Sequence, residues 1–312
     1  MKILVYLEAA PVKGGIEIFA ERHVAELRAD GHEVEVTSTI DFQPSTFDAY
    51  DEVIVHKCGD VATLEKFPPE KTTYYVHDHD PICPRSYAYT PLKHNCSRPG
   101  GIWPCIICAP ACRRWKVALH RVLTQGRRKK AMAKFKRIVV ISEFMKSRLV
   151  TNGIPADHIV VSPPTIRLSA SNAQLSTKID LLYVGQLIRG KGVQLLLQAM
   201  AMAKRKRTLD IVGTGNMENE LKELAQNLGL GECVRFHGFQ NNPQDWMTAA
   251  KCVVVPSFWQ EPFGLVAAEA VALGKKVVAF AIGGLPEACG GKAILVPPGD
   301  VAALAKVMDE EV

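Results

Sequence analysis

The chain lacks a long hydrophobic run: no apolar stretch approaches the roughly 20 residues that a membrane-spanning helix needs. Residues 1–6 (MKILVY) have the pattern of a strand and not that of a signal peptide. No internal repeat of solenoid period is visible. These absences predict a cytoplasmic globular protein.

Neither sign of charge is in large excess, since the net charge is +6 over 312 residues. Hydrophobic residues make up 47% of the chain and charged residues 22%, which describes a soluble protein with large cores. The length exceeds that of one ordinary domain, so we expect two domains of about 150 residues.

The basic residues are unevenly distributed. One cluster lies in a short helical region at residues 113–137, and a second covers residues 204–207. No aromatic stacking platform accompanies them, which argues against nucleic-acid binding. A basic helical face attracts anionic lipid head groups, so peripheral contact with the cytoplasmic face of a membrane is one interpretation. A solvated face is the alternative, and it is favoured for the second cluster.

Strand and helix patterns alternate along both halves, which predicts two parallel sheets with crossover helices: an α/β protein with two Rossmann-like, doubly wound domains. We place the first domain at residues 1–165 and the second at 176–312, joined by a turn-rich linker of Ser, Asn and Pro. The expected strands of the first half are Ile3–Leu7, Val34–Val36, Val53–His56, Thr73–Val76 and Ile138–Ile141, with helices at Ile16–Leu27 and about Arg114–Ala133. The expected strands of the second half are Leu181–Val184, Leu209–Val212, Val234–Phe236, Cys252–Val255, Val277–Phe280 and Ile294–Val296.

The segment EPFGLVAAE, from Glu261 to Glu269, follows one of these strands and leads into a helix. It therefore lies at the carboxyl edge of a parallel sheet, where ligands bind in open α/β folds. Gly264 allows close backbone approach, and the amide groups that open the helix favour an anionic group. Glu261 precedes the helix and Glu269 lies roughly two turns into it, so both carboxylates can accept hydrogen bonds from sugar hydroxyls. By spacing alone, a capped helix with Glu269 in solvent fits equally well.

This segment resembles the Glu-seven-residues-Glu motif of the retaining glycosyltransferases of family 4, which have the two-domain GT-B architecture with a central cleft. The resemblance runs from residue 2 to about residue 300. It implies that Glu261 lies near the donor sugar, that Glu269 binds the ribose hydroxyls, and that the amides of Phe263, Gly264 and Leu265 face the sugar and pyrophosphate. Chains of this kind usually continue past the last helix, Asp300–Glu311, with a segment that crosses back to the first domain; here the sequence ends at Val312.

Three more loops carry parts of the family pattern. Gly14 and Gly15 match the glycine-rich first loop, which closes over the donor phosphates, but they lack the full spacing of a dinucleotide fingerprint. Lys191 matches the family's lysine, whereas Gln186 stands where an arginine is usual; Arg189 either supplies the missing charge or is a solvated side chain. The resemblance further assigns Gly213, Gly215 and Phe239 to the nucleoside site.

His77 ends a strand of the first domain, where the family has a histidine in the cleft. The resemblance implies that it contacts the donor sugar or the acceptor, and its neighbour Asp78 is a weaker candidate. Ser142 also ends a strand, and we expect it to cap the following helix. The side chain of His237 is expected to be an ordinary strand-end histidine.

Five of the nine cysteines fall in an insertion at about residues 83–112. Cys105 and Cys108 have the spacing of a metal knuckle, and His94 is nearby, so a structural zinc ion would order this loop. An iron–sulfur cluster and free thiols are the alternatives. The candidate ligands are Cys83, Cys96, Cys105, Cys108 and Cys112.

The resemblance implies a retaining, metal-independent hexosyltransferase that moves a sugar from a nucleotide-sugar, most commonly UDP-linked, to a hydroxyl of a glycan or lipid-linked acceptor. Cell-surface polysaccharide, lipopolysaccharide or glycoconjugate synthesis is the implied setting. No Asp-x-Asp motif stands beside the donor loops, so no catalytic metal is expected. Two alternatives stay open: a GT-B nucleotide-sugar epimerase, and a non-catalytic binding subunit, at which Gln186 and the short C-terminus hint.

Overall fold

The computed structural model describes all residues except 9–14, 40–43, 87, 91–94, 113–114 and 169–178. Gly14, His94, the basic pair at 113–114 and most of the expected linker lie outside the described residues. The chain divides into two compact units, Met1–Pro164 and Thr165–Val312. None of the helices in the described ranges is long and apolar enough to cross a membrane.

The first unit is a six-stranded parallel sheet with the strand order β2-β1-β3-β4-β5-β6. Its inner strands β1, β3 and β4 are short and largely buried because helices cover both faces of the sheet. The order reverses between β1 and β3, which places the ligand-binding edge of this unit at the loops that follow these strands. The strands are β1 (Lys2–Leu7), β2 (Glu33–Thr37), β3 (Glu52–Lys57), β4 (Thr72–Val76), β5 (Arg137–Val140) and β6 (Ile159–Val161).

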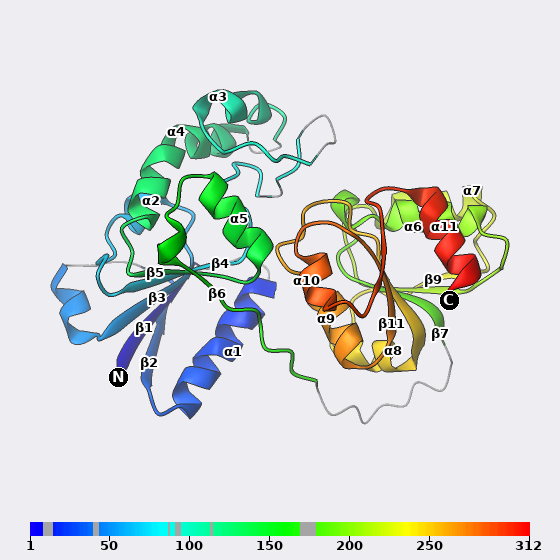
Figure 1. Cartoon of the computed structure of the whole chain (residues 1–312), viewed down its shortest axis with the longest axis horizontal. Coiled ribbons are helices and arrows are strands. Elements are labelled where there is room, and N and C mark those ends of the chain that lie inside the picture. Colours follow the sequence, from blue (N-terminus) through cyan, green and yellow to red (C-terminus); the bar gives the residue numbers. More distant parts are fainter. Residues whose placement is uncertain (9–14, 40–43, 87, 91–94, 113–114, 169–178) are drawn as a thin grey trace. The chain divides into compact units, whose positions relative to one another are not determined.

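Helix α1 covers one face of this sheet, and α4 and α5 cover the other (Figure 1). Val24 of α1 packs on Ile3, Val5 and Ile54, while the opposite face buries Met132 of α4 among the larger cluster. The helices are α1 (Gly15–Ala29), α2 (Val61–Leu64), α3 (Ile102–Cys105), α4 (Trp115–Met132) and α5 (Glu143–Thr151). Ser142 caps α5, as predicted, by accepting a hydrogen bond from the Met145 amide at 3.1 Å.

The second unit repeats the plan with the order β12-β11-β10-β7-β8-β9, the doubly wound order of dinucleotide-binding domains. The strands are β7 (Ile179–Val184), β8 (Leu209–Val212), β9 (Val234–Phe236), β10 (Ala250–Val255), β11 (Lys276–Phe280) and β12 (Ile294–Val296). All the strands expected from the sequence are present, and the pattern missed only β6 among the described strands.

The helices of this unit fall into two layers. Helices α6, α7 and α11 bury their apolar stripes on one face of the sheet, and α8, α9 and α10 cover the other. Because the helices that follow β7 and β10 leave toward opposite faces, the loops after these adjacent strands diverge and leave room at the edge. The helices are α6 (Val193–Met202), α7 (Glu218–Asn227), α8 (Pro243–Ala249), α9 (Leu265–Ala272), α10 (Leu285–Cys289) and α11 (Val301–Glu310).

Candidate functional site

The loops after β7 and β10, residues 185–192 and 256–264, are fastened to each other at the point where the strand order of the second unit reverses. The Phe258 amide donates to the Gly190 carbonyl at 3.1 Å. Gly192 has φ +76°, and a Cβ there would lie 1.8 Å from the Pro256 carbonyl oxygen. Only glycine therefore permits this close approach of the two backbones.

An ion pair joins these loops. Lys191 Nζ lies 2.5 Å from Glu261 Oε1, and the same oxygen accepts from Ser257 Oγ at 2.6 Å and Trp259 Nε1 at 3.0 Å. Lys191 Nζ also lies 5.3 Å from the centroid of the Trp259 ring, within reach of its π-face. The pattern predicted both charged residues, but it gave no sign that they contact each other.

Glu261 is ionised at neutral pH although it is only 7% exposed. Burial alone would raise the pKa of this carboxyl, but the Lys191 charge and the three hydrogen bonds outweigh burial and lower the pKa below its ordinary value. The site is therefore a preformed, nearly neutral unit: a buried carboxylate, and a cation that is still partly exposed.

Gly264 and α9 complete this edge of the sheet. Gly264 has φ +117°, and a Cβ there would lie 2.5 Å from the Leu285 side chain. Phe263 is buried, and Leu265 is the first residue of α9. The first N–H groups of a helix have no acceptor within the helix itself. Because α9 begins at Leu265, the half-buried Glu269 lies little more than one turn into the helix, and the expected two turns were wrong.

Gln186 and Arg189 are both exposed at the rim of the first of these loops. Arg189 Nη2 lies 3.8 Å from Glu220 Oε1, and both side chains are at least half in solvent. Such a pair contributes little to stability, so Arg189 can change partner at small cost. Arg189 is therefore a candidate for the charge that Gln186 lacks.

The glycines assigned to the nucleoside lie close to the same edge. The Gly213 amide donates to the Gly238 carbonyl at 2.7 Å, and a Cβ on Gly215 would lie 2.3 Å from the Leu187 carbonyl oxygen. Phe239, which follows, is 72% exposed and offers an open aromatic face. His237 instead makes a contact within the protein, since its Nε2 lies 2.6 Å from Asp210 Oδ1.

In the first unit, His77 follows β4 and belongs to a row of three histidines. Its Nε2 lies 3.0 Å from His56 Nδ1, and His56 Nε2 lies 3.1 Å from His23 Nδ1. Tyr75 Oη lies 3.3 Å from His23 Nε2. Burial lowers the pKa of all three imidazoles, that of His77 to about 3. Sequence reasoning missed two members of the row.

Asp78, the residue after His77, also has a shifted pKa. Burial, and then the neighbouring Asp80 carboxylate, raise its pKa to about 7. Asp80 itself pairs with Arg121, Nη1 to Oδ1, at 3.1 Å, and its amide donates to Asp78 Oδ1 at 2.8 Å. A carboxyl that titrates near neutral pH beside His77 is a functional candidate that the sequence signalled only by its place at a strand end.

Gly15, the described member of the expected glycine pair, is the first residue of α1. The strand order of this sheet reverses between β1 and β3. There Glu8, which follows β1, accepts a hydrogen bond at Oε2 from the amide of Gly59, which follows β3, at 2.6 Å. Loops after β1 and β3 are thus tied together, as those after β7 and β10 are in the second unit.

The cysteine insertion does not fit the expected zinc site. The nine cysteines form no disulfide, and in the described part of the chain no three His, Cys, Asp or Glu side chains are placed to hold a metal ion. Burial, and then neighbouring thiols, raise the pKa of Cys83, Cys105 and Cys108. Cys112 Sγ donates to the Cys108 carbonyl at 3.3 Å.

The raised pKa of Asp78 predicts a pH-dependent stability difference. In the folded chain the carboxyl keeps its proton up to about pH 7, whereas in the unfolded chain it ionises from its ordinary value of 3.8. The unfolded state then binds fewer protons over this window, so Asp78 lowers stability as the pH rises from about 4 to 7. Asp78→Asn does not titrate. Its unfolding free energy minus that of the wild type should rise over this window, measured by urea denaturation; a difference that stays flat with pH contradicts the assignment.

Comparison with known proteins relates the second unit to a sequence family and the whole chain to a known fold. Residues 166–311, slightly less than half the chain, match the family model of glycosyl transferases group 1. The D-inositol 3-phosphate glycosyltransferase of Arthrobacter sp. (strain FB24) is 36% identical over 175 residues, which are 49% of this chain and 41% of that protein. The chain thus matches less than half the length of this relative.

Two solved structures show the same fold. Anabaena Alr3699/HepE, in complex with UDP and glucose, has a TM-score of 0.71 at 20% identity over 99% of this chain and 89% of that one. WaaG, a glycosyltransferase involved in lipopolysaccharide biosynthesis, has a TM-score of 0.68 at 15% identity over 98% of this chain and 89% of that one. The predicted GT-B fold, two parallel-sheet α/β domains, is therefore confirmed. The sequence similarity lies with glycosyl transferases group 1, over the second unit of the chain.

Proposed function

We propose that this protein is a retaining glycosyltransferase that transfers a sugar from a nucleotide-sugar to an acceptor hydroxyl. The observation that carries the proposal is the Lys191–Glu261 pair at the switch point of the second unit, flanked by the start of α9. The match of residues 166–311 to glycosyl transferases group 1 supports it. The UDP in the HepE complex supports UDP as the nucleotide of the donor.

Lys191 is suited to binding a diphosphate while it keeps its contact with Glu261. An ammonium group has three donor hydrogens, and Glu261 Oε1 takes one of them. The remaining two, with the amides at Gly264 and Leu265, bind the oxygens of the diphosphate and stabilise the negative charge that develops as the sugar leaves. Glu261 then orients the donor sugar, and Glu269 accepts from the ribose hydroxyls.

In the proposed reaction, the acceptor oxygen bonds to the anomeric carbon on the face from which the nucleoside diphosphate departs. The bond from that carbon to the phosphate oxygen breaks, and the departing phosphate takes the acceptor's proton. This route requires no protein nucleophile and no metal ion. His77 contacts the sugar or the acceptor, which is a glycan or lipid-linked hydroxyl in the synthesis of a cell-surface polysaccharide, lipopolysaccharide or glycoconjugate.

A panel of UDP-, GDP- and ADP-linked sugars, tested for binding and slow hydrolysis, examines the donor half of this function without an acceptor. Binding with hydrolysis supports a transferase. Binding with neither hydrolysis nor transfer to any acceptor supports a non-catalytic subunit, while conversion of the free nucleotide-sugar to its epimer supports an epimerase.

The same donor site predicts distinct effects for its two carboxylates. Glu269→Ala removes the acceptor for the ribose hydroxyls and should weaken nucleotide binding by roughly 1.5–3 kcal/mol, the contribution of hydrogen bonds to a charged group. Glu261→Gln keeps the shape but removes the charge that holds Lys191, so turnover should fall more than nucleotide affinity. Calorimetric binding of UDP and steady-state rates measure the two effects.

Glu223→Gln, on the exposed face of α7, is the matched control and should behave as the wild type. Because removal of one partner of a buried ion pair costs about 3–5 kcal/mol of stability, each variant's melting temperature is measured beside its rate. A folded Glu261→Gln protein with full activity would contradict the assignment of the motif.

The charge that Gln186 lacks gives a second prediction. If Arg189 leaves Glu220 for the diphosphate, Arg189→Ala should lower the transfer rate on the order of 10²-fold, about as much as Lys191→Ala. Lys222→Ala, an exposed cation of α7, serves as the control. A wild-type rate in Arg189→Ala would mean that the leaving group departs with one cation fewer.

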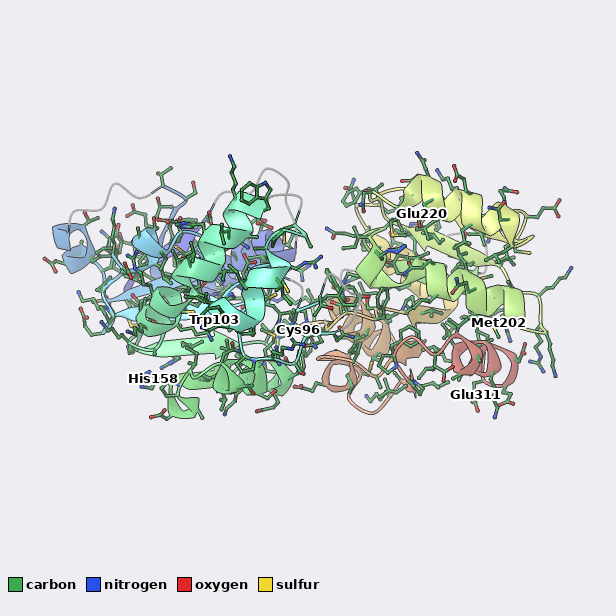
Figure 2. All side chains as sticks on the ribbon, turned by 90° about the horizontal axis from the view of Figure 1, so that it is seen from above. Cys96, Trp103, His158, Met202, Glu220 and Glu311 are labelled. Atoms are coloured by element: carbon green, nitrogen blue, oxygen red, sulfur yellow. The ribbon has the colours of Figure 1, made fainter. Side chains whose placement is uncertain are left out.

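We further propose that α3 and α4 provide peripheral contact with an anionic membrane. Trp103 is 87% exposed and Ile107 66% exposed, and Figure 2 labels Trp103 in this region. The solvent face of α4 presents Lys116, Leu123 and Lys130. Apolar side chains beside lysines suit the boundary between head groups and acyl chains.

Cosedimentation with vesicles that contain phosphatidylglycerol should capture the protein at low salt. Trp103→Ala combined with Ile107→Ser should lower the affinity for these vesicles at least tenfold, since each apolar side chain that the membrane buries contributes about 1.5–3 kcal/mol. Trp246→Phe, in the second unit, is the control. Equal capture by neutral and anionic vesicles, or none, would contradict the contact.

A further inference from the structure

We propose that Tyr75, His23 and His56 hold His77 as a neutral imidazole whose only proton is on Nδ1, so that His77 is a hydrogen-bond donor to the ligand and never a base. The row of hydrogen bonds is inferred from distances within the first unit. The role toward a sugar or acceptor rests on the proposed function.

The sheet itself aligns this row. Val55 of β3 is in register with Tyr74 of β4, so the next residues along, His56 and Tyr75, are neighbours on the opposite face. His77 lies two residues beyond Tyr75 and shares its face, and α1 supplies His23 from above. Strand alternation and register therefore place His56 beside Tyr75 and His77, and α1 adds His23 to the row.

Packing keeps the four rings in place. His56 is 1% exposed. Phe19 of α1 lies against the row, with its ring centroid 4.8 Å from that of His77 and 5.8 Å from that of His56. The rings of His56 and His77 stack with their centroids 5.2 Å apart. Rings confined in this way cannot turn to exchange their hydrogen-bond partners without leaving a cavity.

Burial keeps the imidazoles neutral, and charges nearby do not reverse this. Burial lowers the pKa of His56 well below its ordinary value, and the neighbouring rings lower it further. His77 is also disfavoured as a cation by Lys57. Glu26 and Glu52 act in the opposite sense on His23 but do not overcome its burial. Each ring therefore has one proton to place on two nitrogens.

Tyr75 decides the placement. A phenol, with an ordinary pKa of about 10, is a stronger donor than a neutral imidazole N–H, and an imidazole nitrogen is a stronger acceptor than a phenol oxygen. Burial raises the pKa of Tyr75 to about 12, so the hydroxyl keeps its proton. It therefore donates to His23 Nε2, which leaves the proton of His23 on Nδ1.

The same choice then passes along the row. His23 Nδ1–H donates to His56 Nε2, and His56 Nδ1–H donates to His77 Nε2. His77 Nε2 is thus an acceptor within the protein, and its proton is on Nδ1, for which no hydrogen-bond partner is found in the described part of the chain. An N–H group at this atom donates a hydrogen bond to a hydroxyl or phosphate oxygen. It cannot remove the proton of the acceptor substrate's hydroxyl, which agrees with the proposal that the departing phosphate is the base.

The tautomers can be measured directly by long-range ¹H–¹⁵N correlation NMR at pH 7 on protein with ¹⁵N-labelled histidine. We expect pyrrole-type Nδ1 and pyridine-type Nε2 in His23, His56 and His77, assigned from the loss of signals in His23→Asn, His56→Asn and His77→Asn. A pyrrole-type Nε2 in His77, or a doubly protonated ring, would overturn the proposal whether or not any transfer is detected.

Two tyrosine variants on one strand complete the test. Tyr75→Phe removes the donor that sets the direction, so the pyrrole-type signal of His77 should shift at least in part to Nε2, and kcat should fall about tenfold, the effect of one hydrogen bond, with less change in KM. Tyr74→Phe, whose ring packs on the other face, should change neither. Unchanged His77 signals in Tyr75→Phe would overturn the role of Tyr75, whereas the expected tautomers in a protein without transferase activity would count against the proposed function alone.

Discussion

The buried contact between Lys191 and Glu261 is the interaction on which the candidate donor site depends. It joins the loops after β7 and β10, which belong to adjacent strands whose helices leave toward opposite faces. Burying either charge alone would be costly, and together with Ser257 and Trp259 they form a nearly neutral group. The pair therefore fixes two loops that would otherwise diverge, and it keeps a cation available at the edge to which the proposed function assigns a diphosphate.

Backbone contacts at glycine make this ion pair possible. The approach of Gly192 to Pro256 brings the two loops within reach of each other, because no side chain intervenes. Gly264 lets the second loop turn into α9 against Leu285. The sequence motif thus encodes a geometry as well as a set of ligands: the glycines set the spacing of the backbones, and the charged residues occupy the space that results.

The sequence was sufficient for the fold because buried parallel strands are short apolar runs separated by helical periods. It also singled out Lys191, Glu261 and Glu269 as candidates, since each stands at a fixed distance from a strand end. It did not reveal the row of histidines. His23 followed the helical period as though it were part of the core, and His56 lay within an apolar strand, so only the register of β3 with β4 joins them to His77. The cysteine spacing is not matched by a cluster of metal-binding side chains in the part of the chain that the structure describes, because proximity along the chain does not make thiols converge.

The two units differ in the electrostatics that they offer to the proposed sugar transfer. The second unit keeps ionised groups at its binding edge, which suits a diphosphate whose negative charge grows as the bond to the sugar breaks. At the end of β4 in the first unit, burial lowers the pKa of His77 to about 3 and raises that of Asp78 to about 7, so both groups carry less charge at neutral pH than they would in water. A sugar carries no charge and is recognised by directed hydrogen bonds, so its partner needs a fixed donor more than a cation. In the proposed function, a neutral, oriented imidazole at His77 meets that need.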